Sequence, residues 1–227
     1  MASHPVFSFQ RSKDLFKRAT AVIPGGIYGT KTPGFVVPGA YPYFIERAKD
    51  SRFWDADGNE FIDYLCGYGS MILGYGNEAV DQAVMEQIPG GYLLNQPAPV
   101  MVELAERLVE QIHGMDWSVF AMNGSDATDL AVNLAKVQTQ KRGIIMADGA
   151  YHGTGNWCSS NTFPVLDGRR DMHTFPYNDL ESLRALFDQN SGNIAAVILT
   201  PYHHRTFDPQ VMPDPDLYPT VRELCDR

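Results

Sequence analysis

The 227-residue sequence contains few cysteines, no long apolar run and no excess of basic residues, and each shortage argues against a class of protein. Cys66, Cys158 and Cys225 lie far apart and form no metal-ligand pattern, so we expect buried free thiols. No window approaches about 18 consecutive apolar residues, which argues against a membrane span. The net charge of −9 argues against a nucleic-acid surface, which would be basic. The first residues lack the apolar segment of a secretory signal, so we expect a cytoplasmic protein.

The sequence is nevertheless rich enough in apolar residues, at 44% hydrophobic and 11% aromatic, to form a packed core. Its first part predicts a short amphipathic helix at residues 12–22, closed by a Pro-Gly-Gly turn, and an irregular loop at 27–42. Strand-like runs follow, with a tight hairpin turn at Asp57-Gly58; the runs are Tyr43–Glu46, Arg52–Asp55 and Glu60–Leu65. We therefore expect an N-terminal segment, residues 1–66, made of a helix and a small antiparallel sheet.

From about residue 77 the sequence alternates between helical stripes and short apolar strands. The predicted helices are a stripe from Val80 to Ile88, then residues 98–112, 125–140, Leu180–Phe187 and Leu217–Cys225. The predicted strands are Ser118–Met122, Gly143–Ala147 and Ile194–Leu199. This alternation is typical of an α/β fold with a mostly parallel sheet flanked by helices. We expect residues 67–227 to be the first part of a large domain, incomplete at the C-terminus, because so few strands leave apolar edges exposed.

The junction between a predicted strand and a predicted helix at residues 120–128 has the composition of a phosphate site. It contains Asn123, Gly124, Ser125 and Asp126, with the glycine at the turn and the serine suited to capping a helix. A helix N-terminus offers unpaired N–H groups and the positive end of the helix dipole, and a hydroxyl adds one donor. The alternative is an ordinary capped helix, because Asp126 would also favour a helix start.

A second loop, residues 148–153, follows the strand that ends at Ala147. In an open α/β sheet, ligands bind beyond the carboxyl ends of the strands, so this loop and the Gly124 loop are expected side by side. Tyr151 could stack on a flat heterocycle, and the neighbouring glycines allow a close approach. The alternative is a tyrosine packed over the sheet edge beside a solvated His152.

Together these motifs resemble the class III pyridoxal-phosphate-dependent aminotransferases, in particular the glutamate-1-semialdehyde 2,1-aminomutase-like branch. Asn-Gly-Ser-Asp-Ala at residues 123–127 is similar to their Ser-Gly-Thr-Glu-Ala, and residues 151–153 match their Tyr-His-Gly. Further segments resemble the branch in the same order, namely Ile23–Gly26, Trp54–Tyr64, Met71–Gly74 and Pro176–Leu180. The resemblance implies fold type I, with this chain as the N-terminal half.

The resemblance also implies roles for individual residues. Gly124 and Ser125 would hold the phosphate of pyridoxal 5'-phosphate (PLP), and Tyr151 would stack on its ring. Further cofactor-binding candidates are Asn123, Asp126 and His152, and the substrate-binding candidates are Tyr28, Tyr68 and Arg205. Such enzymes are usually homodimers with the active site at the subunit interface. An amino donor and a keto acceptor are the implied small-molecule partners.

Three departures from the family pattern affect the expected activity. No lysine follows Lys141, so the lysine that anchors the cofactor is expected downstream of Arg227, in a C-terminal half of the same enzyme. Where relatives have Glu-Pro and an asparagine loop, residues 200–205 are Thr-Pro-Tyr-His-His-Arg. Adjacent histidines without a carboxylate or cysteine partner predict no metal site there. Residues 28–32 lack the arginine that holds the aminomutase's substrate, which argues against the semialdehyde reaction.

The leading hypothesis is thus an aminotransferase that moves an amino group between an amine or amino acid and a keto acid or aldehyde, with this chain inactive alone. One alternative keeps the cofactor and changes the reaction to that of an aminomutase or amino-acid epimerase. The other is an inert, lysine-less binding subunit. Fold-level analogy does not decide between these, because one fold hosts all of them.

Overall fold

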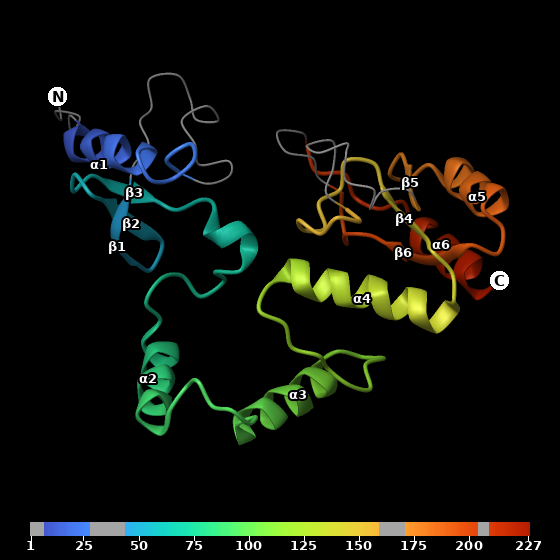
Figure 1. The fold of residues 1–227 in the computed structure, drawn as a ribbon, viewed down its shortest axis with the longest axis horizontal. Helices are drawn as coiled ribbons and strands as arrows, with labels where there is room; N and C mark the ends of the chain where they lie inside the picture. The colour runs from blue at the N-terminus through green and yellow to red at the C-terminus, as the bar shows by residue number, and fades with distance from the viewer. Residues whose placement is uncertain (1–6, 28–43, 159–170, 204–208) are drawn as a thin grey trace. The chain divides into compact units, whose positions relative to one another are not determined.

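The computed structural model describes residues 7–27, 44–158, 171–203 and 209–227. The chain forms two compact units, Met1–Pro97 and Ala98–Arg227, which Figure 1 colours from blue to green and from green to red. Each unit is described here by itself. The predicted domain boundary at residue 66 stays a prediction.

The first unit begins with the predicted helix and antiparallel sheet. Helix α1 (Gln10–Thr20) precedes the strands β1 (Ile45–Lys49), β2 (Arg52–Asp55) and β3 (Glu60–Ile62), which pair in the order β1-β2-β3. Both pairings are antiparallel, and the predicted turn at Asp57-Gly58 joins β2 to β3. Gly58 has φ +84°, a conformation that glycine adopts without a steric penalty.

Asp57 in this turn also fixes the start of α1. Its carboxylate accepts the backbone N–H groups of Arg11 at 2.7 Å and Ser12 at 2.8 Å, and the hydroxyl of Ser12 at 2.6 Å. The residue before the helix, Phe9, supplies no side-chain cap. A side chain from the hairpin therefore satisfies donors that a helix N-terminus would otherwise leave unpaired.

The remainder of the first unit is a helical segment. The 3₁₀ turn η3 (Cys66–Gly69) is followed by helix α2 (Glu78–Gln87) and the short turn η4 (Ile88–Gly90). The side chain of Asn77 accepts the N–H of Val80 and caps α2. The helical stripe predicted from Val80 to Ile88 is confirmed.

The second unit is built on a parallel sheet, as predicted. The strands β4 (Gly143–Ala147), β5 (Met172–Phe175) and β6 (Ile194–Ile198) lie in the order β5-β4-β6, with β4 in the centre. Both pairings are parallel. All five residues of β4 are buried, as expected of a strand that is covered on both faces.

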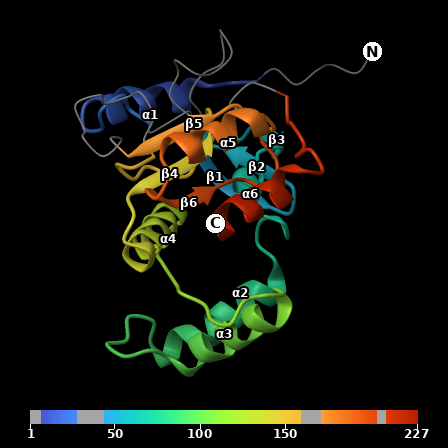
Figure 2. The same ribbon diagram turned by 90° about the vertical axis from the view of Figure 1, so that its right-hand side faces the viewer.

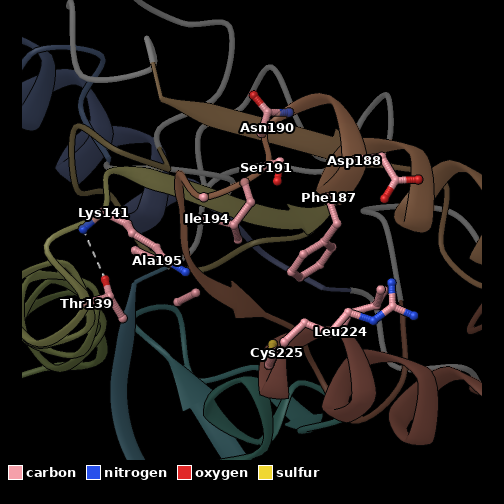
Figure 3. A pocket seen from close by; sticks show the side chains of 13 residues that line it. Thr139, Lys141, Phe187, Asp188, Asn190, Ser191, Ile194, Ala195, Leu224 and Cys225 are labelled. Carbon is pink, nitrogen blue, oxygen red and sulfur yellow. Dashed lines mark hydrogen bonds between the residues drawn. The ribbon is translucent and has the colours of Figure 1, made fainter.

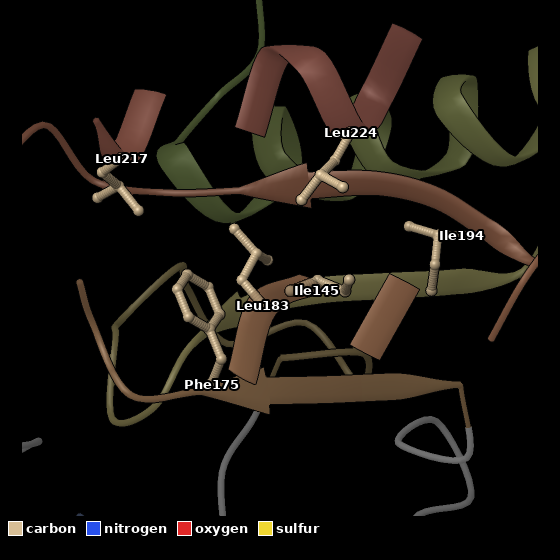
Figure 4. Close-up of a cluster of buried hydrophobic side chains, with 6 residues drawn as sticks. All are labelled: Ile145, Phe175, Leu183, Ile194, Leu217 and Leu224. Carbon is tan, nitrogen blue, oxygen red and sulfur yellow. The ribbon is translucent and has the colours of Figure 1, made fainter. Parts of the chain in front are cut away.

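Helices cover both faces of this sheet (Figures 1 and 2). On one face, α5 (Leu180–Gln189) and α6 (Leu217–Asp226) place Leu183, Leu217 and Leu224 in a buried cluster with residues of β4, β5 and β6 (Figure 4). On the other face, α4 (Gly124–Thr139) packs Val132 in a cluster with Ile144. Successive strand residues point to opposite faces, which explains why Ile144 and Ile145 belong to different clusters.

One predicted strand is wrong and one strand was missed. Residues 118–122 form no strand, and Val119, Phe120 and Met122 are exposed. An extended segment needs a neighbouring strand for its N–H and C=O groups, and the described residues bring none beside this one. Strand β5 was not predicted, because Met-His-Thr-Phe is short and mixed in polarity.

Helix α3 (Pro99–Gln111) agrees with the helix predicted at 98–112.

The cysteines only partly match the expectation of buried free thiols. All three are free, but Cys66 and Cys225 are exposed and only Cys158 is buried. Within the described ranges, no helix combines the length and the apolar character that crossing a membrane requires.

Candidate cofactor site

The N-terminus of α4 forms the centre of the candidate site. Asn123 is the extended residue before the helix, and its side-chain oxygen accepts the N–H of Asp126 at 3.0 Å. Its amide group donates to the Asp126 carboxylate at 2.9 Å. The first N–H groups of a helix have no acceptor within the helix, and this cap satisfies that of Asp126. At the first two helical positions, the N–H groups of Gly124 and Ser125 have no acceptor within the helix, and the helix dipole favours an anion there.

Gly124 has free space on the side where a side chain would project. A Cβ atom built on Gly124 would meet no atom within 4 Å. Ser125 is half-buried, and its hydroxyl oxygen accepts the N–H of Thr154 at 3.0 Å and lies 3.4 Å from the hydroxyl of that residue. Open space, two N–H groups and a held hydroxyl fit a phosphate group.

The second predicted loop lies against the same end of α4. It follows β4 through a turn in which the N–H of Ala150 donates to the carbonyl of Ala147 at 3.1 Å. Tyr151 is 71% exposed and offers a free ring face. A Cβ on Gly153 would lie 2.6 Å from the hydroxyl oxygen of Ser125, so loop and helix are in direct contact. The structure thus brings the two predicted loops together.

His152, in the same loop, is buried at 8% exposure, so its interpretation as a solvated side chain is wrong. Its ring stacks on Trp157 at 6.3 Å between centroids. Burial lowers the pKa of His152, and the nearby His203 lowers it further. Among the described residues, its Nε2 atom has no hydrogen-bond partner. The imidazole is therefore neutral near pH 7.

Four residues that the sequence did not single out hold this loop to α4. They are Thr128, Asp129, Thr154 and Trp157. The hydroxyl of Thr128 lies 2.8 Å from the carbonyl oxygen of His152, and the indole N–H of Trp157 donates to Asp129 at 2.5 Å. Thr128 is the last residue of the predicted junction at 120–128 and Asp129 follows it, but a contact made 24 or 28 residues away leaves no local pattern.

The segment after β6 contains the residues that depart from the family pattern. His203 is buried, its ring stacks on Tyr177 at 5.0 Å, and its backbone pairs with Val211. His204 and Arg205 lie outside the described residues. The part of the chain that is described contains no group of three or more histidine, cysteine or acidic residues able to hold a metal ion.

The other substrate-binding candidates belong to the first unit. Tyr28 lies outside the described residues. Tyr68 is 72% exposed and has φ +58°, next to Gly67 at +57° and Cys66 at +49°. Non-glycine residues in this region cost about 1–3 kcal/mol each, and such strain is concentrated at functional sites.

Two lysines of the second unit lie away from the N-terminus of α4. Lys136 is 12 residues beyond Gly124, or about 18 Å along the helix axis at the usual rise per residue. Lys141 precedes β4 and lines a cavity of about 450 Å³ with Ile194 and Ala195 (Figure 3). These residues lie at the amino ends of β4 and β6, whereas Tyr151 follows the carboxyl end of β4. The cavity and Tyr151 are therefore at opposite ends of the strands. Neither lysine reaches the candidate phosphate site.

A comparison with protein families assigns most of the chain. The family Aminotransferase class-III matches residues 36–227. The chain belongs to the class III aminotransferases. Members of this family use PLP as their cofactor, which agrees with the expected ligand of the Gly124–Ser125 site.

Known proteins of the class III family resemble nearly all of this chain. It is 40% identical to the aminopentol aminotransferase of Sphingopyxis macrogoltabida, covering 95% of this chain and 51% of that protein. It is 35% identical to the glutamate-1-semialdehyde 2,1-aminomutase of Acetivibrio thermocellus, covering 97% and 54%. The FumI protein of Sphingopyxis sp. MTA144, solved in its PLP internal aldimine form, is similar with a TM-score of 0.91 and 39% identity, covering 95% and 52%.

These comparisons confirm the predicted family and fold type I. The chain spans about half the length of the curated relatives that it matches.

Proposed function

We propose that this chain is the phosphate- and ring-binding part of a PLP-dependent aminotransferase that transfers an amino group between an amine or amino acid and a keto acid or aldehyde. The observation that carries the proposal is the open N-terminus of α4, capped by Asn123 and in contact with the loop that bears Tyr151. The proposal is supported because a helix N-terminus beside a loop with an exposed aromatic ring suits a ligand that carries both a phosphate and a ring. Its family supports the reaction type.

The chain's own residues would bind and orient the cofactor. The N–H groups of Gly124 and Ser125 donate to the phosphate, and the Ser125 hydroxyl adds a third donor. Asn123 and Asp126 hold the first turn in place through their mutual hydrogen bonds. Tyr151 offers its exposed face to the ring, and the buried, neutral His152 adds no positive charge beside it.

PLP supplies an electron sink that stabilises negative charge on the substrate carbon. The protein must add a lysine that anchors the cofactor and moves protons. Lys136 and Lys141 are too far from the phosphate site for this role. We therefore propose that the lysine belongs to a C-terminal half of the same enzyme and that the isolated chain does not transaminate.

The substrate pocket and the assembly are also part of the proposal. Tyr28, Tyr68 and Arg205 are proposed to contact the substrate, with the strained backbone at Tyr68 as support for that residue. We propose a cytoplasmic homodimer. Its support is the set of exposed apolar side chains between residues 64 and 122, which a subunit interface would cover; they include Tyr64, Ile72, Leu93 and Met122.

A second candidate reaction is that of an aminomutase. It is favoured by the 35% identity with the Acetivibrio thermocellus aminomutase. The stretch from Tyr28 to Thr32 has no arginine, which favours transfer over the semialdehyde reaction. The two reactions differ in their requirement for a keto co-substrate. Incubation of the native protein with an amino donor, with and without a keto acid, therefore separates them.

The cofactor site is tested by titrating the native protein with PLP and following its absorbance. Ser125→Ala removes one hydrogen bond to a charged group, about 1.5 kcal/mol, and should weaken PLP binding about tenfold. Ser191→Ala is the matched control, because Ser191 lines the cavity at the opposite end of the strands. Equal affinities of the two variants would contradict the assigned phosphate site.

A second measurement locates the lysine. Borohydride treatment of the PLP-loaded native protein, followed by peptide mass mapping, should label a lysine absent from these 227 residues. A labelled Lys136 or Lys141 would overturn the division of roles proposed above. Absence of any PLP binding by the native protein would overturn the proposed function itself.

A further inference from the structure

Side-chain contacts join the first turns of α4 to the loop that carries Tyr151. Thr128 lies one turn beyond Ser125, and its hydroxyl is 2.8 Å from the carbonyl oxygen of His152 and 3.0 Å from that of Ser125. The hydroxyl hydrogen of Thr128 is thus placed between the carbonyl oxygen of His152, which follows Tyr151, and that of Ser125, the proposed phosphate-binding residue. Thr128 is half-buried, which protects this contact from water.

Asp129 makes the second contact. Its carboxylate accepts the indole N–H of Trp157 at 2.5 Å, and Trp157 is buried and stacked on His152. A charge-assisted hydrogen bond of this kind is about twice as strong as a neutral one. This series of contacts, from Asp129 through Trp157 to His152, ends at the residue next to Tyr151.

The glycines of the loop let it lie directly on the helix. A Cβ on Gly155 would be 2.0 Å from the Asp129 carboxylate, and one on Gly153 would be 3.0 Å from the Cα of Ser125. No side chain fits in either place, so the separation between loop and helix is fixed by direct contact. Tyr151 is also fixed from its other side, by the turn that follows the fully buried strand β4.

We infer that Thr128 and Asp129 are positioning residues that set the distance between the phosphate-binding N-terminus of α4 and the ring-binding Tyr151. The inference rests on the proposed function. A ligand that carries both a phosphate and a ring spans the two places, and its binding depends on their spacing. A ligand that is phosphate alone uses only the end of α4 and does not depend on it.

The test compares PLP with inorganic phosphate in the native protein and in Thr128→Val, which keeps the side-chain shape and removes the hydroxyl. A hydrogen bond contributes about 1 kcal/mol, so PLP affinity should fall roughly fivefold while phosphate affinity stays within about twofold. The visible circular dichroism of bound PLP should also fall, because the ring is held less firmly. Thr128→Ser keeps the hydroxyl and should restore both signals.

Three further variants keep the test decisive if Thr128→Val folds poorly. Thr128→Ala also lacks the hydroxyl and favours the helix. Asp129→Ala removes the acceptor of Trp157, whereas Asp129→Asn keeps an oxygen in its place. A selective loss of PLP affinity in Thr128→Ala and Asp129→Ala, which Thr128→Ser and Asp129→Asn do not show, supports the inference. Equal losses for PLP and phosphate, or no loss for either, overturn it. A native protein that binds phosphate but not PLP overturns the proposed function instead.

Discussion

Replacing Gly153 with alanine should damage the site in two ways, through the backbone conformation of this residue and through a clash with Ser125. Gly153 has φ +109°, which L-residues rarely adopt and which costs about 1–3 kcal/mol. The new Cβ would also lie 2.6 Å from the Ser125 hydroxyl oxygen and 3.0 Å from the Ser125 Cα. Overpacking against such atoms costs about 1–3 kcal/mol more. We therefore expect Gly153→Ala to lower the free energy of unfolding by about 4 kcal/mol.

Gly192→Ala separates the two contributions. Gly192 has φ +76°, and a Cβ there meets no atom within 4 Å, so it has the backbone cost without the clash. We expect a loss of about 1 kcal/mol for this variant. Urea unfolding, monitored by tryptophan fluorescence, measures the free energy of unfolding of both variants. The two curves are fitted with a common dependence of that free energy on urea concentration.

Binding provides a second readout of the same pair. Relief of the clash at Gly153 moves Ser125 away from the phosphate position, so PLP affinity should fall in Gly153→Ala and remain unchanged in Gly192→Ala. A Gly153→Ala protein that is no less stable than Gly192→Ala, and that binds PLP as the native protein does, would refute the direct contact between loop and helix.

Three further predictions concern the helix cap, a buried histidine and the core. Asn123→Ala should lower the free energy of unfolding by about 1 kcal/mol, because it removes the acceptor of the Asp126 N–H. Asn123→Asp keeps an acceptor and should cost much less. The denaturant midpoints of the two variants test this difference. Burial lowers the pKa of His152 below its ordinary value of 6.5. The unfolded chain then binds more protons, so stability is full above about pH 6.5 and is lost as the pH falls below it. His152→Gln should flatten that loss between pH 7.5 and 5.5, and an unchanged pH profile would contradict the assignment. Leu183 is fully buried, so Leu183→Ala should cost roughly 3 kcal/mol, with a lower melting temperature as the measure.

Much of the second unit follows from local sequence patterns. The apolar run at Gly143–Ala147 predicts a buried strand because its length and composition suit no other element, and β4 has these same bounds. The Asn-Gly-Ser-Asp sequence predicts a helix start because capping is a local property, and α4 begins at Gly124. The predicted capping residue, Ser125, is wrong, because Asn123 precedes the helix and its side chain accepts the N–H of Asp126. The parallel pairing of β4 and β6 follows because a predicted helix, at Leu180–Phe187, separates them along the chain.

Features that depend on distant partners did not follow from the sequence. Residues 118–122 have a strand-like composition, but a strand also needs a neighbour, and composition does not show which one. His152 looks like a surface residue in sequence, yet it is buried and its ring stacks on that of Trp157. The contacts of Thr128 and Asp129 with the loop are likewise invisible in a local pattern, because each is made more than 20 residues away.

The contact between Asp57 and α1 bears on the order in which the first unit is made. During synthesis, residues 10–20 leave the ribosome before Asp57, which caps them from 45 residues further along the chain. A helix of 11 residues without a cap is marginal in water. We therefore expect the nascent segment to remain unstructured until the β2–β3 hairpin has emerged. A ribosome-bound chain that ends before Asp57 should then be readily cleaved by proteases within its first 20 residues.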